Sequence, residues 1–159
     1  MSAAFDTIDH KILIHRLNSW FGISDNALKF MSSYLSTRTQ SVIINGCSSN
    51  PKPLVTGVPQ GSVLGPLLFT MYTTPLSYVL SDSSANSHFY ADDTQLYCSF
   101  SVQDSHASIA CLSSTLDKVH QWFSDNRLSL NPSKTEFLLI GNKQQRGKLP
   151  LCHFLLKIL

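Results

Sequence analysis

The chain has 159 residues, of which 43% are hydrophobic and only 14% are charged, against about 25% charged residues in an average soluble domain. This length fits one domain or the core of a larger one, and the hydrophobic content excludes a chain that is disordered throughout. Twelve Lys and Arg residues against ten Asp and Glu residues give a net charge of +2. A surface that tracks phosphates by charge alone is therefore excluded, and any binding of nucleic acid has to come from a specific site.

The first half of the chain reads as two helices followed by a hairpin. Apolar residues at helical spacing predict a helix over residues 10–21 that ends before Gly22, and Ser24 is placed to cap a second helix. The pattern then changes to β-prone residues at 40–44, a turn at Asn45-Gly46 and a return strand at 52–56.

The second half alternates helices and strands. We expect one helix over residues 62–79, a hairpin of strands 88–91 and 94–100, a helix over 105–126 and a strand over 135–140. Residues 142–159 show no periodicity and form a degenerate basic and apolar tail, so we place the domain at residues 1–141.

Residues 63–80 are apolar and uncharged, which makes a membrane-spanning protein one alternative. Pro66 and Pro75, with hydroxyl-bearing residues between them, argue against a span because they disrupt a helix in lipid. The N-terminus lacks the pattern of a signal peptide, so we expect no membrane association and an intracellular protein, in the cytoplasm or the nucleus. The cysteines lack the short spacing of paired zinc ligands.

Three segments carry possible chemistry. The first is residues 4–10 (AFDTIDH), where Asp9 also suits a helix N-cap and Asp6 a turn. The second is residues 57–66 (GVPQGSVLGP), which reads either as a tightly packed corner or as a glycine-lined surface that a base pair approaches. The third is the pair Asp92-Asp93 at a hairpin tip, which reads either as an ordinary turn or as a magnesium site.

Together and in this order, these segments resemble the palm subdomain of the reverse transcriptases of non-LTR (LINE-type) retrotransposons. Residues 128–136 (LSLNPSKTE) resemble a fourth motif of that family, and the similarity runs from residue 2 to about residue 141. The resemblance implies an α+β fold, a ferredoxin-like palm in which a small antiparallel sheet is backed by helices.

The resemblance also implies RNA-directed DNA polymerase activity, a nucleotidyl transfer with Mg²⁺ as cofactor, two ions in the intact family. Its partners would be an RNA template, a DNA primer and a deoxynucleoside triphosphate. Asp92 and Asp93 would be the metal ligands, with Asp92 the stronger one. Lys134 would lie near the pyrophosphate as a candidate proton donor.

Three further residues receive roles from the resemblance. Phe5 would lie under the sugar and exclude a 2′-hydroxyl, while Gln60 and Gly61 would contact the pair of template base and nucleotide.

One feature departs from the family pattern. The family's first motif begins with a metal-binding aspartate five residues before the position of Phe5, which falls one residue before Met1. We therefore expect a palm fragment with its first strand clipped, a weak or single metal site, no activity of its own, and self-association through the exposed sheet edge. The alternative is a non-catalytic module that binds RNA or protein.

Overall fold

The computed structural model describes residues 3–59, 61–90, 93–101, 103–131, 133–140 and 153–158. The backbone divides into two compact units, one from Ala3 to Tyr72 and the other from Thr73 to Leu159. Each unit buries its own set of apolar side chains.

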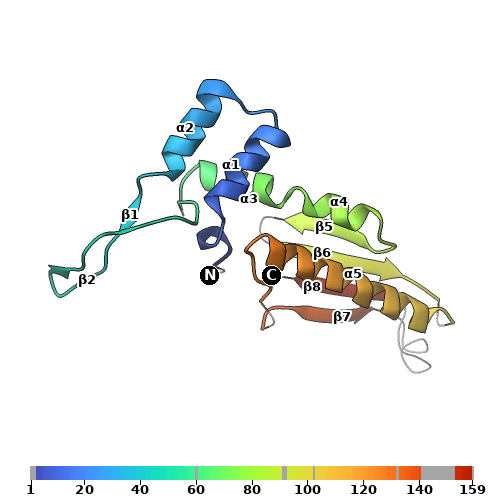
Figure 1. Ribbon diagram of the computed structural model, residues 1–159. Coiled ribbons are helices and arrows are strands. Elements are labelled where there is room, and N and C mark those ends of the chain that lie inside the picture. Colours follow the sequence, from blue (N-terminus) through green and yellow to red (C-terminus); the bar gives the residue numbers. More distant parts are fainter. Residues whose placement is uncertain are drawn as a thin grey trace. The chain divides into compact units, whose positions relative to one another are not determined.

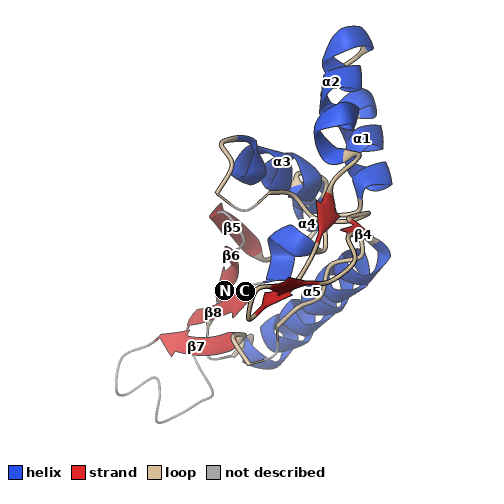
Figure 2. Cartoon of the chain, turned by 90° about the vertical axis from the view of Figure 1, so that its left-hand side faces the viewer, coloured by secondary structure: helices blue, strands red, loops and turns tan. Residues whose placement is uncertain are grey.

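The first unit begins with a short 3-10 helix, Ala3–Asp6, followed by helices α1 (His10–Ser19) and α2 (Asp25–Leu35). Asp9 caps α1, because its Oδ1 accepts hydrogen bonds from the backbone N–H groups of Lys11 at 2.8 Å and Ile12 at 3.1 Å. The predicted helix over residues 10–21 is confirmed, and Gly22 follows its end with a positive φ of 65°. Helices α1 and α2 lie side by side (Figure 2).

A hairpin follows α2, with strands β1 (Thr39–Gln40), β2 (Ile43–Ile44), β3 (Cys47–Ser48) and β4 (Lys52–Pro53). The predicted turn at Asn45-Gly46 is confirmed, and both residues have positive φ, 50° and 81°. The predicted continuous strands are wrong, because β1 pairs only with β4 and β2 only with β3. Pro51, which lies between β3 and β4, has no N–H to donate, and this favours a break in the ladder at that point.

Helix α3 (Leu64–Thr73) ends the first unit and helix α4 (Leu76–Ser81) begins the second. The single helix predicted for residues 62–79 is therefore wrong. Pro75 lies at the N-cap of α4, where its ring and missing N–H interrupt the helical hydrogen bonds. Within the first unit, α3 buries Leu68, Phe69 and Tyr72.

The second unit holds an antiparallel sheet of strands β5 (Asn86–Tyr90), β6 (Asp93–Ser99), β7 (Glu136–Ile140) and β8 (His153–Ile158). The order in the sheet is β5-β6-β8-β7, and α4 and the long helix α5 (Ser105–Asp125) lie on one face of it (Figures 1 and 2). This arrangement confirms the α+β palm architecture and the predicted hairpin, helix and strand of the second half.

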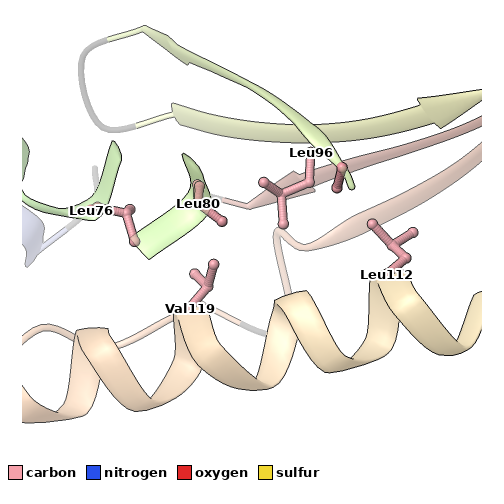
Figure 3. Packing of buried hydrophobic residues seen from close by; sticks show 6 residues of the cluster. Leu76, Leu80, Leu96, Leu112 and Val119 are labelled. Atoms are coloured by element: carbon pink, nitrogen blue, oxygen red, sulfur yellow. The ribbon is translucent and has the colours of Figure 1, made fainter. Parts of the chain in front are cut away.

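The core of this unit lies between the helices and β6. Leu76 and Leu80 of α4, Leu96 of β6, and Leu112 and Val119 of α5 form one cluster (Figure 3). Each such buried side chain contributes about 1.5–3 kcal/mol to the free energy of folding.

Strand β8 lies in the region expected to be a degenerate tail. It pairs with β6 from Thr94 to Ser99 and with β7 from Glu136 to Ile140. In the described sheet β6 is thus paired on both sides, and the outer strands are β5 and β7.

None of the helices in the described ranges combines the length and apolar character needed to cross a membrane. The apolar stretch 63–80 is instead divided between α3 and α4, and each helix buries part of its apolar side chains within its own unit.

Candidate functional site

The first and second chemical segments pack against each other, backbone to backbone, within the first unit. The N–H of Gly57 donates to the carbonyl of Ile8, and the N–H of Val58 donates to the carbonyl of Phe5, both at 2.8 Å. Asp9 and Thr56 extend this contact as an isolated β-bridge. The glycine-rich corner is therefore held in place by the residues that precede α1.

Two glycines of the corner are required for different reasons. A Cβ on Gly57 would lie 3.0 Å from both the Cα and the carbonyl oxygen of Asp6, and φ at Gly57 is +86°. Gly61 also has a positive φ, +77°, but no atom of the described residues lies within 4 Å of its missing Cβ. Gly57 is thus demanded by packing, whereas Gly61 leaves an open approach to the backbone. Gln60 lies outside the described residues.

A cavity of about 440 Å³ lies beside this corner, entirely within the first unit. Its lining combines one guanidinium, one carboxylate, hydroxyl and amide groups, and the backbone of the corner: Asp6, Arg38, Thr39, Gln40, Leu54, Thr56, Gly57, Val58 and Pro59. Such a mixture of charged and polar groups suits a polar ligand, and the guanidinium can bind an anionic group of it.

Arg38 is the cation of this cavity, and sequence reasoning missed it. It follows α2, and its Cζ lies 5.4 Å from the centre of the Tyr34 ring, so the aromatic face positions the guanidinium. A signal was present in the sequence, since Arg38 is a single cation between Thr37 and Thr39 in a hydroxyl-rich segment.

Phe5 is half-buried, and its ring packs against that of Phe69 from α3, with centroids 4.9 Å apart and an interplanar angle of 33°. This ring contact holds the side chain of Phe5 in place. The backbone carbonyl of Phe5 also accepts the hydrogen bond from the N–H of Val58, so the residue lies beside the glycine-rich corner. That Phe5 excludes a nucleotide with a 2′-hydroxyl stays a prediction.

In the second unit, Asp93 is the first residue of β6 and pairs with Tyr90 at the end of β5. Thr94 and Leu96 are buried toward the helices, so the alternation along the strand directs Asp93 to the opposite face of the sheet. Asp92, the preferred metal ligand, lies outside the described residues. Among those that are described, no three His, Cys, Asp or Glu side chains gather where they could hold a metal ion.

Lys134 lies at the same end of the sheet as Asp93. Glu136 of β7 is level with Lys157 of β8, which is level with Gln95 of β6. Strands β6 and β7 are therefore separated by two strand spacings, about 10 Å. The half-buried Lys134 precedes β7 in a turn in which its N–H donates to the carbonyl of Asn131 at 3.1 Å.

An acid-bearing hairpin, a sheet with helices on one face and a glycine-rich corner are together the features of a polymerase palm fragment. The family model for reverse transcriptase (RNA-dependent DNA polymerase) matches residues 1–155, and the chain belongs to this family.

The similar curated proteins come from retrotransposons. The RNA-directed DNA polymerase from the mobile element jockey of Drosophila melanogaster is 30% identical over 146 residues, which cover 88% of this chain and 15% of the relative. The probable RNA-directed DNA polymerase from transposon BS of the same species is 33% identical over 140 residues, 85% of this chain and 15% of the relative. The retrovirus-related Pol polyprotein from the type-1 retrotransposable element R2 of Popillia japonica is 25% identical over 141 residues, 82% of this chain and 22% of the relative.

These relatives confirm the predicted resemblance to non-LTR retrotransposon enzymes. The chain spans only about 15% of the length of the two Drosophila relatives.

Proposed function

We propose that this chain supplies the palm of an RNA-directed DNA polymerase, the part that positions metal, nucleotide and primer for nucleotidyl transfer. The observation that carries the proposal is the family match over residues 1–155, joined to a hairpin that presents Asp93 on the helix-free face of its sheet. The partners would be an RNA template, a DNA primer and a deoxynucleoside triphosphate.

Asp92 and Asp93 would hold the metal, for which the hard carboxylate oxygens fit Mg²⁺. The ion would polarise the attacking hydroxyl and stabilise the charge on the leaving phosphates. Among the described residues, Asp93 is not part of any group of three His, Cys, Asp or Glu side chains that could hold a metal ion, so a clamp for two ions would require a further acid. We infer that the metal site of the 159 residues alone is weak or holds a single ion.

Lys134 would act on the leaving pyrophosphate. Its place at the same sheet end as Asp93, about two strand spacings away, supports a role for its ammonium near the phosphates. A lysine there can neutralise developing charge or donate a proton.

The cavity of the first unit would receive part of the nucleic acid or nucleotide. Arg38 would bind a phosphate, Gly61 and Gln60 would lie against the base pair, and Phe5 would exclude a 2′-hydroxyl. The open space at Gly61 and the mixed polar lining around Arg38 support these roles.

The test of the polymerase proposal is reconstitution. The 159 residues alone should incorporate no nucleotide above the level of an Asp92→Ala variant. A version extended at its N-terminus, with a β-prone segment and an Asp five residues before Phe5, should bind Mn²⁺ more tightly, because that acid completes the ligand set. Titration of Mn²⁺ by electron paramagnetic resonance measures this gain, and primer extension on an RNA template is the parallel activity assay.

The matched control carries Asn in place of the added Asp, which keeps the strand and removes the charge. Equal Mn²⁺ affinity of the Asp and Asn versions would show that the hairpin acids do not share a metal with the first motif. Incorporation by the unextended chain that disappears in Asp92→Ala would contradict the proposal that this chain alone is inactive.

A non-catalytic module that binds RNA is the second candidate, and the cavity around Arg38 is the observation in its favour. Binding of a labelled RNA–DNA hybrid, followed by fluorescence anisotropy, should weaken about tenfold in Arg38→Gln, since a charge-assisted contact is lost. Lys29→Gln is the control, because it removes one positive charge from an exposed position of α2 outside the cavity. Binding of RNA without any metal dependence in the extended version would favour this second function.

A further inference from the structure

Two cysteines that the polymerase function does not use lie at one small cavity of the second unit. The cavity has a volume of about 120 Å³, and both Cys98 of β6 and Cys111 of α5 line it, together with Ser84, Ala85, Ser99, Ser108 and Leu112. Both thiols are free and partly exposed, so small molecules in solvent can reach them.

The fold places these two thiols at one cavity although they lie on different elements, Cys98 on β6 and Cys111 on α5. Cys98 packs against the core cluster that contains Leu112, the neighbour of Cys111 on α5. The register of β5 and β6 pairs Asn86 with Tyr97, so Ala85 comes opposite Cys98 at the next position outward. Ser84, which precedes Ala85, is the residue whose Oγ lies 2.6 Å from the Sγ of Cys111.

The environments of the two thiols differ. The hydrogen bond with the Ser84 hydroxyl lowers the pKa of Cys111 and outweighs the opposite effect of partial burial, and Lys118 lowers it further. Burial raises the pKa of Cys98, and the neighbouring Cys111 adds to that rise. Both effects favour Cys111 over Cys98 as the thiol that ionises first.

We propose that Cys111 and Cys98 form a peroxide-reactive dithiol site, in which Cys111 is the attacking thiol and Cys98 the resolving thiol. The Cys111 thiolate attacks one oxygen of hydrogen peroxide; the O–O bond breaks, an S–O bond forms, and the departing hydroxide takes up a proton to become water. The Cys98 thiol then loses its proton and attacks the sulfenic sulfur. An S–S bond replaces the S–O bond, and a second water leaves, so one peroxide is reduced and two thiols are oxidised.

The experiment treats the reduced chain of 159 residues with one equivalent of hydrogen peroxide. Free thiols should fall from four to two per chain, and peptide mapping after alkylation should find a Cys98–Cys111 disulfide. In Cys98→Ala the reaction should stop at the sulfenic acid of Cys111, which dimedone labels. In Cys111→Ser no intramolecular disulfide should form.

The exposed Cys47 of β3 is the internal control, since it has no such partner in the cavity. Ser84→Ala should slow labelling of Cys111 and leave labelling of Cys47 unchanged, a result that does not depend on either cysteine variant folding. Labelling of Cys47 at the same rate as Cys111 in the native chain would overturn the proposal. A disulfide to any other cysteine, or a preference for Cys111 that persists in urea, would overturn it as well, because the selectivity would not come from the fold.

Discussion

Gly57 is the residue on which the contact between the first and second chemical segments depends. It combines a left-handed φ of +86° with a missing Cβ that would lie 3.0 Å from the Asp6 backbone. The neighbours on that side are backbone atoms, which cannot rotate away as a side chain can. The corner is therefore a position at which only glycine fits.

We predict that Gly57→Ala lowers the free energy of unfolding of the first unit by about 1–3 kcal/mol or more, since backbone strain and a steric clash add. Gly22→Ala is the matched control, because Gly22 has φ +65° and nothing of the described chain within 4 Å of its missing Cβ. Urea unfolding followed by circular dichroism measures both. Equal losses in the two variants would show that only φ, and not the Asp6 contact, constrains Gly57.

Arg16 is a buried cation that belongs to the scaffold of the first unit. Its guanidinium donates a hydrogen bond to the carbonyl of Tyr72, and its Cζ lies 4.7 Å from the centre of the Tyr72 ring. Burial lowers the pKa of Arg16, although a guanidinium stays charged at neutral pH. The side chain thus ties α1 to the end of α3.

We predict that Arg16→Lys destabilises the first unit by about 1–3 kcal/mol, because lysine keeps the charge but loses the planar donor that both binds the carbonyl and stacks on the ring. The same change at the half-exposed Arg38 should alter stability by about 0.5 kcal/mol or less. Thermal unfolding of the two variants tests this; a smaller loss for Arg16→Lys than for Arg38→Lys would contradict it.

At the scale of elements, β6 is central to the second unit. It pairs with β5 on one side and with β8 on the other, and its inward residues meet α4 and α5. The strand that starts with Asp93 is consequently held from three directions, which keeps its first residue in place.

Leu96→Ala on β6 should lower the free energy of unfolding by about 2–5 kcal/mol, since Leu96 is fully buried and truncation of its side chain leaves a cavity. Trp122, which packs against the same cluster, provides a fluorescence signal for unfolding of this unit. Leu138→Ala on β7 is the control. Because Leu138 is 49% exposed, this substitution should lower the free energy of unfolding far less. A similar loss at both positions would mean that the cluster around Leu96 is not the core.

At the scale of the whole molecule, the chain combines few charges with a large apolar surface. Val42, Ile43 and Ile44 of the hairpin are each at least 62% exposed, and exposed β-branched residues of low charge favour pairing with another chain. We propose that self-association uses this hairpin together with the outer strands β5 and β7, since β8 covers the edge of β6.

We predict that the purified chain associates with rising concentration and that Ile43→Lys reduces this association, because a charge blocks edge pairing. Val63→Lys changes another highly exposed apolar residue outside the hairpin and is the control. Analytical ultracentrifugation measures both variants. A chain that stays monomeric at high concentration, or an equal effect of the two substitutions, would refute the role of the hairpin.

The sequence by itself determined the features that depend on neighbours along the chain. The apolar spacing predicted α5, the residue types at Asn45-Gly46 predicted a turn, and Asp9 was placed to cap α1, as the structure confirms. These are predictable because helices, caps and turns are decided by contacts over a few residues. The order of the motifs likewise sufficed to indicate the reverse transcriptase family.

Only the tertiary structure decided what depends on distant segments. The place of β8 between β6 and β7 could not be predicted, because a short apolar strand has no local signal for its partner. The cavity around Arg38, the approach of Gly57 to Asp6 and the cavity shared by Cys98 and Cys111 have the same origin. In each case the residues lie on different elements, and their meeting follows from the packing of those elements in one unit, which local propensity does not encode.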